Sequence, residues 1–134
     1  MTKEELSKYI SVKNEIPLLA ARLLELEDSK ENITSKITGM PSSGIITDRT
    51  ASIVINIDEI RNMLILKYTE CRVEYNRLNR FILGIEDSEI RQILTLKYVN
   101  GLSWPGVAAA MGNAGDGSTE KKKHYRYLNT LKIP

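Results

Sequence analysis

The chain has 134 residues, of which 42% are hydrophobic and 27% charged, and its formal net charge is +2. This hydrophobic content excludes an intrinsically disordered chain, and the lack of any run of about 18 apolar residues excludes a transmembrane helix. A net charge this small gives, by itself, little support for nucleic-acid binding.

The N-terminal residues and the cysteine content indicate the compartment. Charges at Lys3, Glu4 and Glu5 fall where a secretory signal peptide would need its apolar stretch. Cys71 has no second cysteine with which to form a disulfide or a cysteine-based zinc site. We therefore expect a cytoplasmic protein that has no membrane partner.

The first predicted element is a long amphipathic helix. Pro17 interrupts it, and an interior proline predicts a kink or a new helix start. Turn-forming residues from 38 to 44 then predict a loop. The apolar stripe recurs at spacings of mostly three and four, at Leu6, Tyr9, Val12, Ile16, Leu19, Leu23, Leu26, Ile33 and Ile37.

A second stripe predicts a helix from about residue 50 to 83, capped by Asp48 or Thr50 and ended by Gly84. A helix of this length needs a partner along its length, so we expect it to pack antiparallel on the first segment. The pairing can form within one chain or between two chains, and an exposed stripe would favour dimerisation. Residues 1–84 are thus predicted to be a coiled-coil-like helical hairpin for assembly or partner binding.

Three short helices are predicted in residues 85–134. Asp87 or Ser88 caps the first, and Asn100-Gly101 ends it. Ser103 caps the second, which carries Pro105 in its first turn and stops at Gly112. The third begins at a Ser118 cap and runs to about residue 131. This all-α pattern is typical of a helix-turn-helix domain.

The third of these helices carries the basic residues. Residues 1–87 have a charge balance of −2, whereas residues 88–134 have a balance of +4. A helix of about 10 to 12 Å diameter fits the major groove of B-DNA, which is about 12 Å wide. We expect Ser118 and Thr119 to contact a phosphate or a base edge, and Arg126 to contact guanine through its planar fork. The expected counter-charges for the DNA backbone are Lys121, Lys122, Lys123 and Arg126.

Alternative interpretations apply to the same residues. The lysine run can be a solvated helix face, and Cys71 fits a buried packing thiol better than a nucleophile. His124 is interpreted as a packing or phosphate-contact residue, because no acid or second imidazole lies at ligand spacing. The glycines from 112 to 117 lack the ending of a phosphate-binding loop, so they indicate a turn. We expect neither an enzyme nor a cofactor or metal site.

The segment from Asp87 to Gly112, DSEIRQILTLKYVNGLSWPGVAAAMG, resembles region 4 of bacterial sigma factors. That family has a Leu-x-Leu-x-Tyr type helix end, then Gly-Leu-Ser, then a helix of small residues closed by Leu-Gly or Met-Gly, and then a recognition helix. With its N-terminal hairpin, the chain also resembles small phage and prophage regulators, including the ArpU-type late transcriptional regulators. The resemblance covers residues 87–131 well and the first half by architecture alone.

The resemblance implies binding of double-stranded DNA and regulation of phage genes. It maps the family's contacts onto Ser118, Thr119, Lys121, Lys122, His124, Tyr125 and Arg126. Glu120 and Lys121 stand where an apolar residue often packs in that family, which predicts a weakly anchored third helix. Two further functions are considered: a terminase small-subunit-like factor that recognises packaging DNA, and a helical adapter that binds RNA polymerase or another protein through the hairpin.

Overall fold

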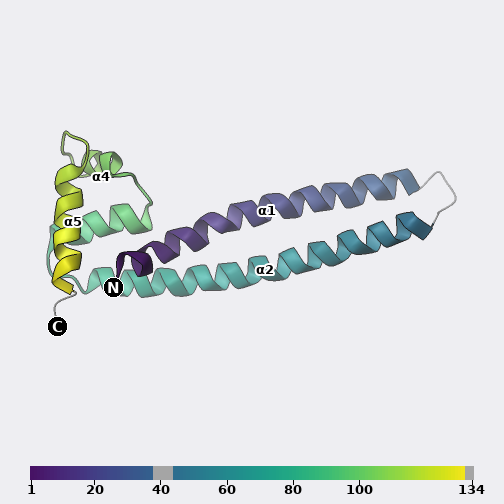
Figure 1. Cartoon of the computed structure of the whole chain (residues 1–134), viewed down its shortest axis with the longest axis horizontal. Helices are drawn as coiled ribbons and strands as arrows, with labels where there is room; N and C mark the ends of the chain where they lie inside the picture. The colour runs from purple at the N-terminus through teal and green to yellow at the C-terminus, as the bar shows by residue number, and fades with distance from the viewer. Residues whose placement is uncertain (38–43, 132–134) are drawn as a thin grey trace. The chain divides into compact units, whose positions relative to one another are not determined.

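The computed structural model describes residues 1–37 and 44–131, and the side chains discussed below lie within 1–30 and 51–131. This part of the chain is all-helical, as predicted (Figure 1). None of its helices is long and apolar enough to cross a membrane. In chain order the elements are α1 (Lys3–Ile37), α2 (Gly44–Leu83), α3 (Ser88–Leu94), the π-helical turn η1 (Thr95–Val99), α4 (Trp104–Ala110) and α5 (Ser118–Leu131).

Helix α1 starts with a capping box. The Thr2 hydroxyl accepts a hydrogen bond from the Glu5 amide at 3.3 Å, and the Glu5 carboxylate accepts one from the Thr2 amide at 3.0 Å. Of the two outcomes predicted for Pro17, a kink or a new helix start, the new start is wrong, because α1 continues through this residue. Pro17 is exposed, so water is available where the proline has no N–H to donate to the preceding turn.

Helix α2 begins earlier than predicted. It starts at Gly44 rather than near residue 50, so positions 48 and 50 lie inside the helix and not at its start. The predicted end is confirmed, since α2 stops at Leu83 and the Gly84 amide closes the last turn onto the Arg80 carbonyl at 3.2 Å. Of the predicted loop, residues 38–43 lie outside the described residues.

Residues 13–70 form one compact unit. Ion pairs join α1 to α2 within it, from Glu15 to Lys67 at 3.0 Å and from Glu27 to Arg61 at 2.9 Å. The residue numbers of the paired residues increase along α1 and decrease along α2, so these parts of the two helices run antiparallel. The buried apolar residues of this unit include Ile16, Ile57 and Ile60, and its exposed large apolar residues include Leu18, Leu24, Ile55, Met63, Ile65, Leu66 and Tyr68.

The second compact unit combines residues 1–12 with residues 71–134. This division differs from the expected one after residue 84, because the ends of both long helices share a core with the short helices. The ion pair between Lys8 and the buried Glu74, at 3.3 Å, also joins these two ends. The core cluster contains Leu6, Tyr9, Leu78, Ile82, Ile85, Ile90, Leu94, Tyr98 and Leu128.

The predicted caps of the short helices are confirmed at two positions. Asp87 caps α3 by accepting hydrogen bonds from the amides of Glu89 and Ile90, at 2.9 and 3.3 Å. Ser103 caps α4 by accepting one from the Gly106 amide at 3.3 Å. Gly101 follows η1 with a φ of +70°, a left-handed conformation that suits glycine.

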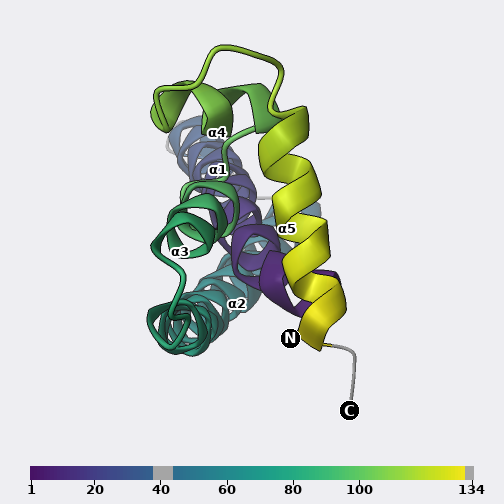
Figure 2. The same cartoon turned by 90° about the vertical axis from the view of Figure 1, so that its left-hand side faces the viewer.

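A close backbone approach fixes the start of α5. Gly117 has a φ of +84°, and a Cβ atom added to it would lie 2.1 Å from the Trp104 carbonyl oxygen. Only a residue without a side chain fits here, so Gly117 lets the start of α5 pack directly on the start of α4. Figure 2 shows α5 lying across α3 and α4.

We expect Gly117→Ala to destabilise this unit by on the order of 2 to 4 kcal/mol, because the substitution adds a backbone clash to a strained φ. Gly112→Ala is the matched control. Gly112 has a φ of +78°, but an added Cβ would have no neighbour within 4 Å, so about 1 kcal/mol is expected from strain alone. Urea unfolding followed by circular dichroism measures both, and equal losses would contradict the close approach.

Candidate nucleic-acid interface

Helix α5 has a buried face and an exposed face. Glu120, His124 and Leu128, spaced four residues apart, are at most 5% exposed. The other face lines an open groove formed by Ser118, Lys121, Lys122, Tyr125, Arg126 and Asn129. Five residues predicted to contact DNA therefore lie together, three of them cations, whereas Thr119, Lys123 and His124 do not line this groove.

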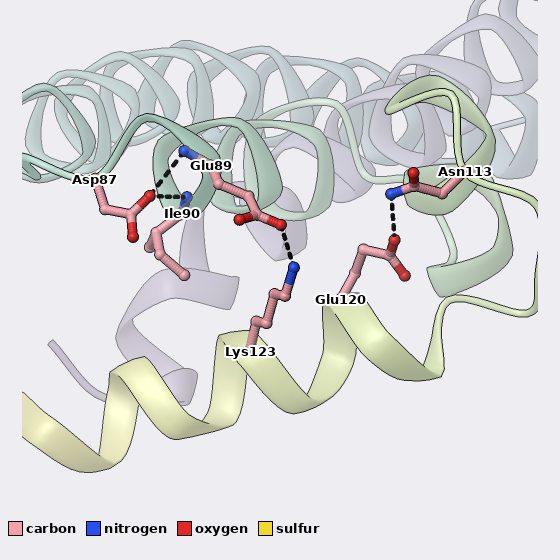
Figure 3. Close-up of polar contacts among 6 residues, drawn as sticks. All are labelled: Asp87, Glu89, Ile90, Asn113, Glu120 and Lys123. Carbon is pink, nitrogen blue, oxygen red and sulfur yellow. Dashed lines mark hydrogen bonds and ion pairs between the residues drawn. The ribbon is translucent and has the colours of Figure 1, made fainter.

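Polar contacts anchor the first turns of α5, contrary to the predicted weak anchoring (Figure 3). Glu120 stands where an apolar residue was expected, yet it is buried and accepts a hydrogen bond from the Asn113 side chain at 2.8 Å. Lys123 bonds Glu89 in the first turn of α3. The α5 helix is thus tied both to the preceding turn and to α3.

The contact with Glu89 corrects the role predicted for Lys123. Its side chain points to α3, and the hydrogen bond with Glu89 raises the pKa of Lys123. Part of its charge is therefore balanced within the protein. The other two residues of the lysine run, Lys121 and Lys122, are both exposed.

The start of α5 also differs from the prediction. Ser118 was expected to be the cap, but it is the first helical residue, and its amide donates a hydrogen bond to the Asp116 carboxylate at 3.0 Å. This bond lowers the pKa of Asp116. The Asp116 carboxylate therefore accepts a hydrogen bond from one of the N–H groups that we expected to bind phosphate. Thr119 lines a separate polar hollow with the turn residues.

His124 is buried, which corrects its assignment as a DNA contact and leaves packing as its role. It has no exposed surface and lies among three aromatic rings, those of Tyr98, Trp104 and Tyr125, with ring centres 4.7 to 5.4 Å away. The Tyr98 hydroxyl is 2.5 Å from its Nε2 atom, and Nδ1 has no hydrogen-bond partner among the described residues. Burial, and then the nearby charges of Lys3 and Lys97, lower the pKa of His124 to about 4.

Two cations near the exposed face of α5, Lys3 and Lys97, were not predicted from the sequence. Lys97 donates a hydrogen bond to the Leu102 carbonyl at 3.3 Å and lies 4.9 Å from the centre of the Trp104 ring. Lys3, in the first turn of α1, donates a hydrogen bond to the Tyr125 hydroxyl at 2.9 Å. The basic run in α5 gives no signal for Lys3, because 122 positions separate it from Tyr125.

The described residues contain no cluster of three or more potential metal ligands. Comparison with protein-family models, with curated proteins and with solved structures finds no match.

We expect the ring protons of His124 to titrate with a midpoint near pH 4, as measured by NMR. The assignment is unambiguous because the chain has one histidine. A histidine whose pKa falls on folding stabilises the folded state fully above its unfolded value of about 6.5, and this contribution is lost as the pH drops toward the folded value. A midpoint near 6.5 would contradict the buried, neutral imidazole.

Proposed function

We propose that this chain is a sequence-specific double-stranded DNA-binding protein of the phage transcriptional-regulator type. The observation that carries the proposal is the division of α5 into two faces. One face is packed on the supporting helices, and the other presents Lys121, Lys122 and Arg126 to solvent. A cationic helix held in this way is suited to lie in a major groove.

The cations on this face have different proposed roles. Lys121 and Lys122 neutralise backbone phosphates, which contributes affinity that falls as salt concentration rises. Arg126 contacts a guanine edge, because its planar guanidinium can donate two parallel hydrogen bonds to O6 and N7. Ser118 and Asn129, on the same groove, add polar groups that can hydrogen-bond a phosphate or a base edge.

The test compares two triple variants with matched charge changes. Replacing Lys121, Lys122 and Arg126 with alanine removes three cations from α5, whereas replacing Lys13, Arg22 and Lys30 removes three exposed cations from α1. Fluorescence anisotropy with a mixed-sequence duplex is recorded across a salt series. We expect the α5 variant to lose binding and the α1 variant to retain it, with the melting temperature of the α5 variant nearly unchanged.

Absence of wild-type binding at low salt, or binding without salt dependence, would overturn the proposal. An α1 variant as weak as the α5 variant would also contradict it, because the effect would then follow net charge alone. If the α5 variant unfolds, its three cations are structural. Selection from a random duplex pool would then test base preference, which we expect Arg126→Ala to relax.

The apolar surface of residues 13–70 supports a second proposal, that this unit associates with a second copy of the chain. Leu66 is 68% exposed and Leu18 is 72% exposed. Exposed patches of several large apolar side chains are typical of interaction surfaces, whereas single exposed apolar residues are common in monomers. The number of subunits also helps to distinguish the two other functions considered. A closed ring of many subunits would favour a DNA-packaging factor, and a monomer that binds RNA polymerase would favour an adapter.

Replacing Ile65 and Leu66 together with glutamine is expected to shift the protein toward the monomer in analytical ultracentrifugation. The substitutions remove exposed apolar surface, so the helical content should stay constant. The control replaces Val73 and Leu83 with glutamine. These two residues are similarly exposed but belong to the other unit. A monomeric wild type at micromolar concentration would contradict association.

A further inference from the structure

The first turn of α1 contributes to the exposed face of α5. Lys3 donates a hydrogen bond to the Tyr125 hydroxyl at 2.9 Å, and its ammonium group lies 5.4 Å from the centre of the Tyr125 ring. Tyr125 lines the groove of α5 together with Lys121 and Arg126. The contact therefore places a cation from the N-terminal segment beside the groove.

Three local features hold Lys3 in this position. The reciprocal bonds between Thr2 and Glu5 fix the first turn of α1. Leu6, one turn later, has no exposed surface and belongs to the same core cluster as Leu128 of α5. The backbone that carries Lys3 is thus fixed relative to α5 by packing, and the side chain is held by Tyr125.

The pair retains hydrogen-bonding capacity for an anion. A lysine ammonium has three donors, and the bond to Tyr125 uses one of them. The Tyr125 hydroxyl accepts this bond and can still donate its own proton. The hydrogen bond from Lys3, together with the charges of Lys3, Lys121 and Lys97, lowers the pKa of Tyr125, because positive charge lies near this hydroxyl. An acceptor with several negative oxygens suits such a group better than a neutral one.

We propose that Lys3, held by Tyr125, binds a backbone phosphate of the duplex and so extends the interface from α5 to the first turn of α1. The inference rests on the proposed DNA-binding function. Phosphate contacts carry no sequence information, so Lys3 contributes to affinity and to the placement of α5 rather than to base preference.

The test uses the full-length chain with Lys3→Ala, Tyr125→Phe, the double variant and the control Lys13→Ala. Lys13→Ala removes the same charge from an exposed position on the same helix. We expect Lys3→Ala to weaken binding roughly three- to tenfold on every duplex sequence tested and to reduce the salt slope by about one. Tyr125→Phe removes only the hydroxyl, so the double variant should lose less than the two single losses combined.

The outcomes separate the two proposals. If the wild-type chain shows no salt-dependent binding, the DNA-binding function itself fails. If the wild type binds and Lys3→Ala matches Lys13→Ala in affinity and slope, only the role of Lys3 is overturned. A Lys3→Ala variant with a lowered melting temperature and an unchanged salt slope would assign Lys3 a structural role and would also overturn the inference.

Discussion

The chain places its one histidine where α5 meets the helices that support it. His124 has no exposed surface, and the rings of Tyr98 and Trp104 and the neighbouring ring of Tyr125 surround it. An uncharged imidazole is tolerated there, because burial opposes its protonation. Its position fixes the rotation of α5 about its own axis, and with it the set of cations that face solvent.

Sequence patterns predict the elements whose signals are local. The caps at Asp87 and Ser103 and the extent of α5 from Ser118 follow from residues within a few positions of each helix end. The burial of Glu120 and the position of Lys3 depend instead on contacts with Asn113 and Tyr125 that no periodicity encodes. The orientation of α5 cannot be predicted for the same reason. A lysine run shows that a helix is basic, but it does not show which of its side chains face the protein core.

The two compact units divide the long helices rather than the chain at Gly84. Within residues 13–70, the described side chains include ion pairs between the two helices, buried isoleucines and large apolar side chains that are exposed to solvent. Residues 1–12 and 71–134 share a core of aliphatic and aromatic side chains and carry the basic groove. Assembly and DNA binding are thus proposed for different units of the chain.

The shared burial of Leu6 and Leu128 has a consequence for biosynthesis. Contacts between segments this distant in sequence form slowly, because a long intervening chain must first be ordered. On the ribosome, the α1 and α2 parts of residues 13–70 can pair before α5 is made, whereas the core cluster that contains Leu6 is complete only after α5 has been synthesised. The basic helix α5 is therefore the last element to join the core that orients it. A nascent chain without α5 lacks Leu128, which belongs to the same core cluster as Leu6.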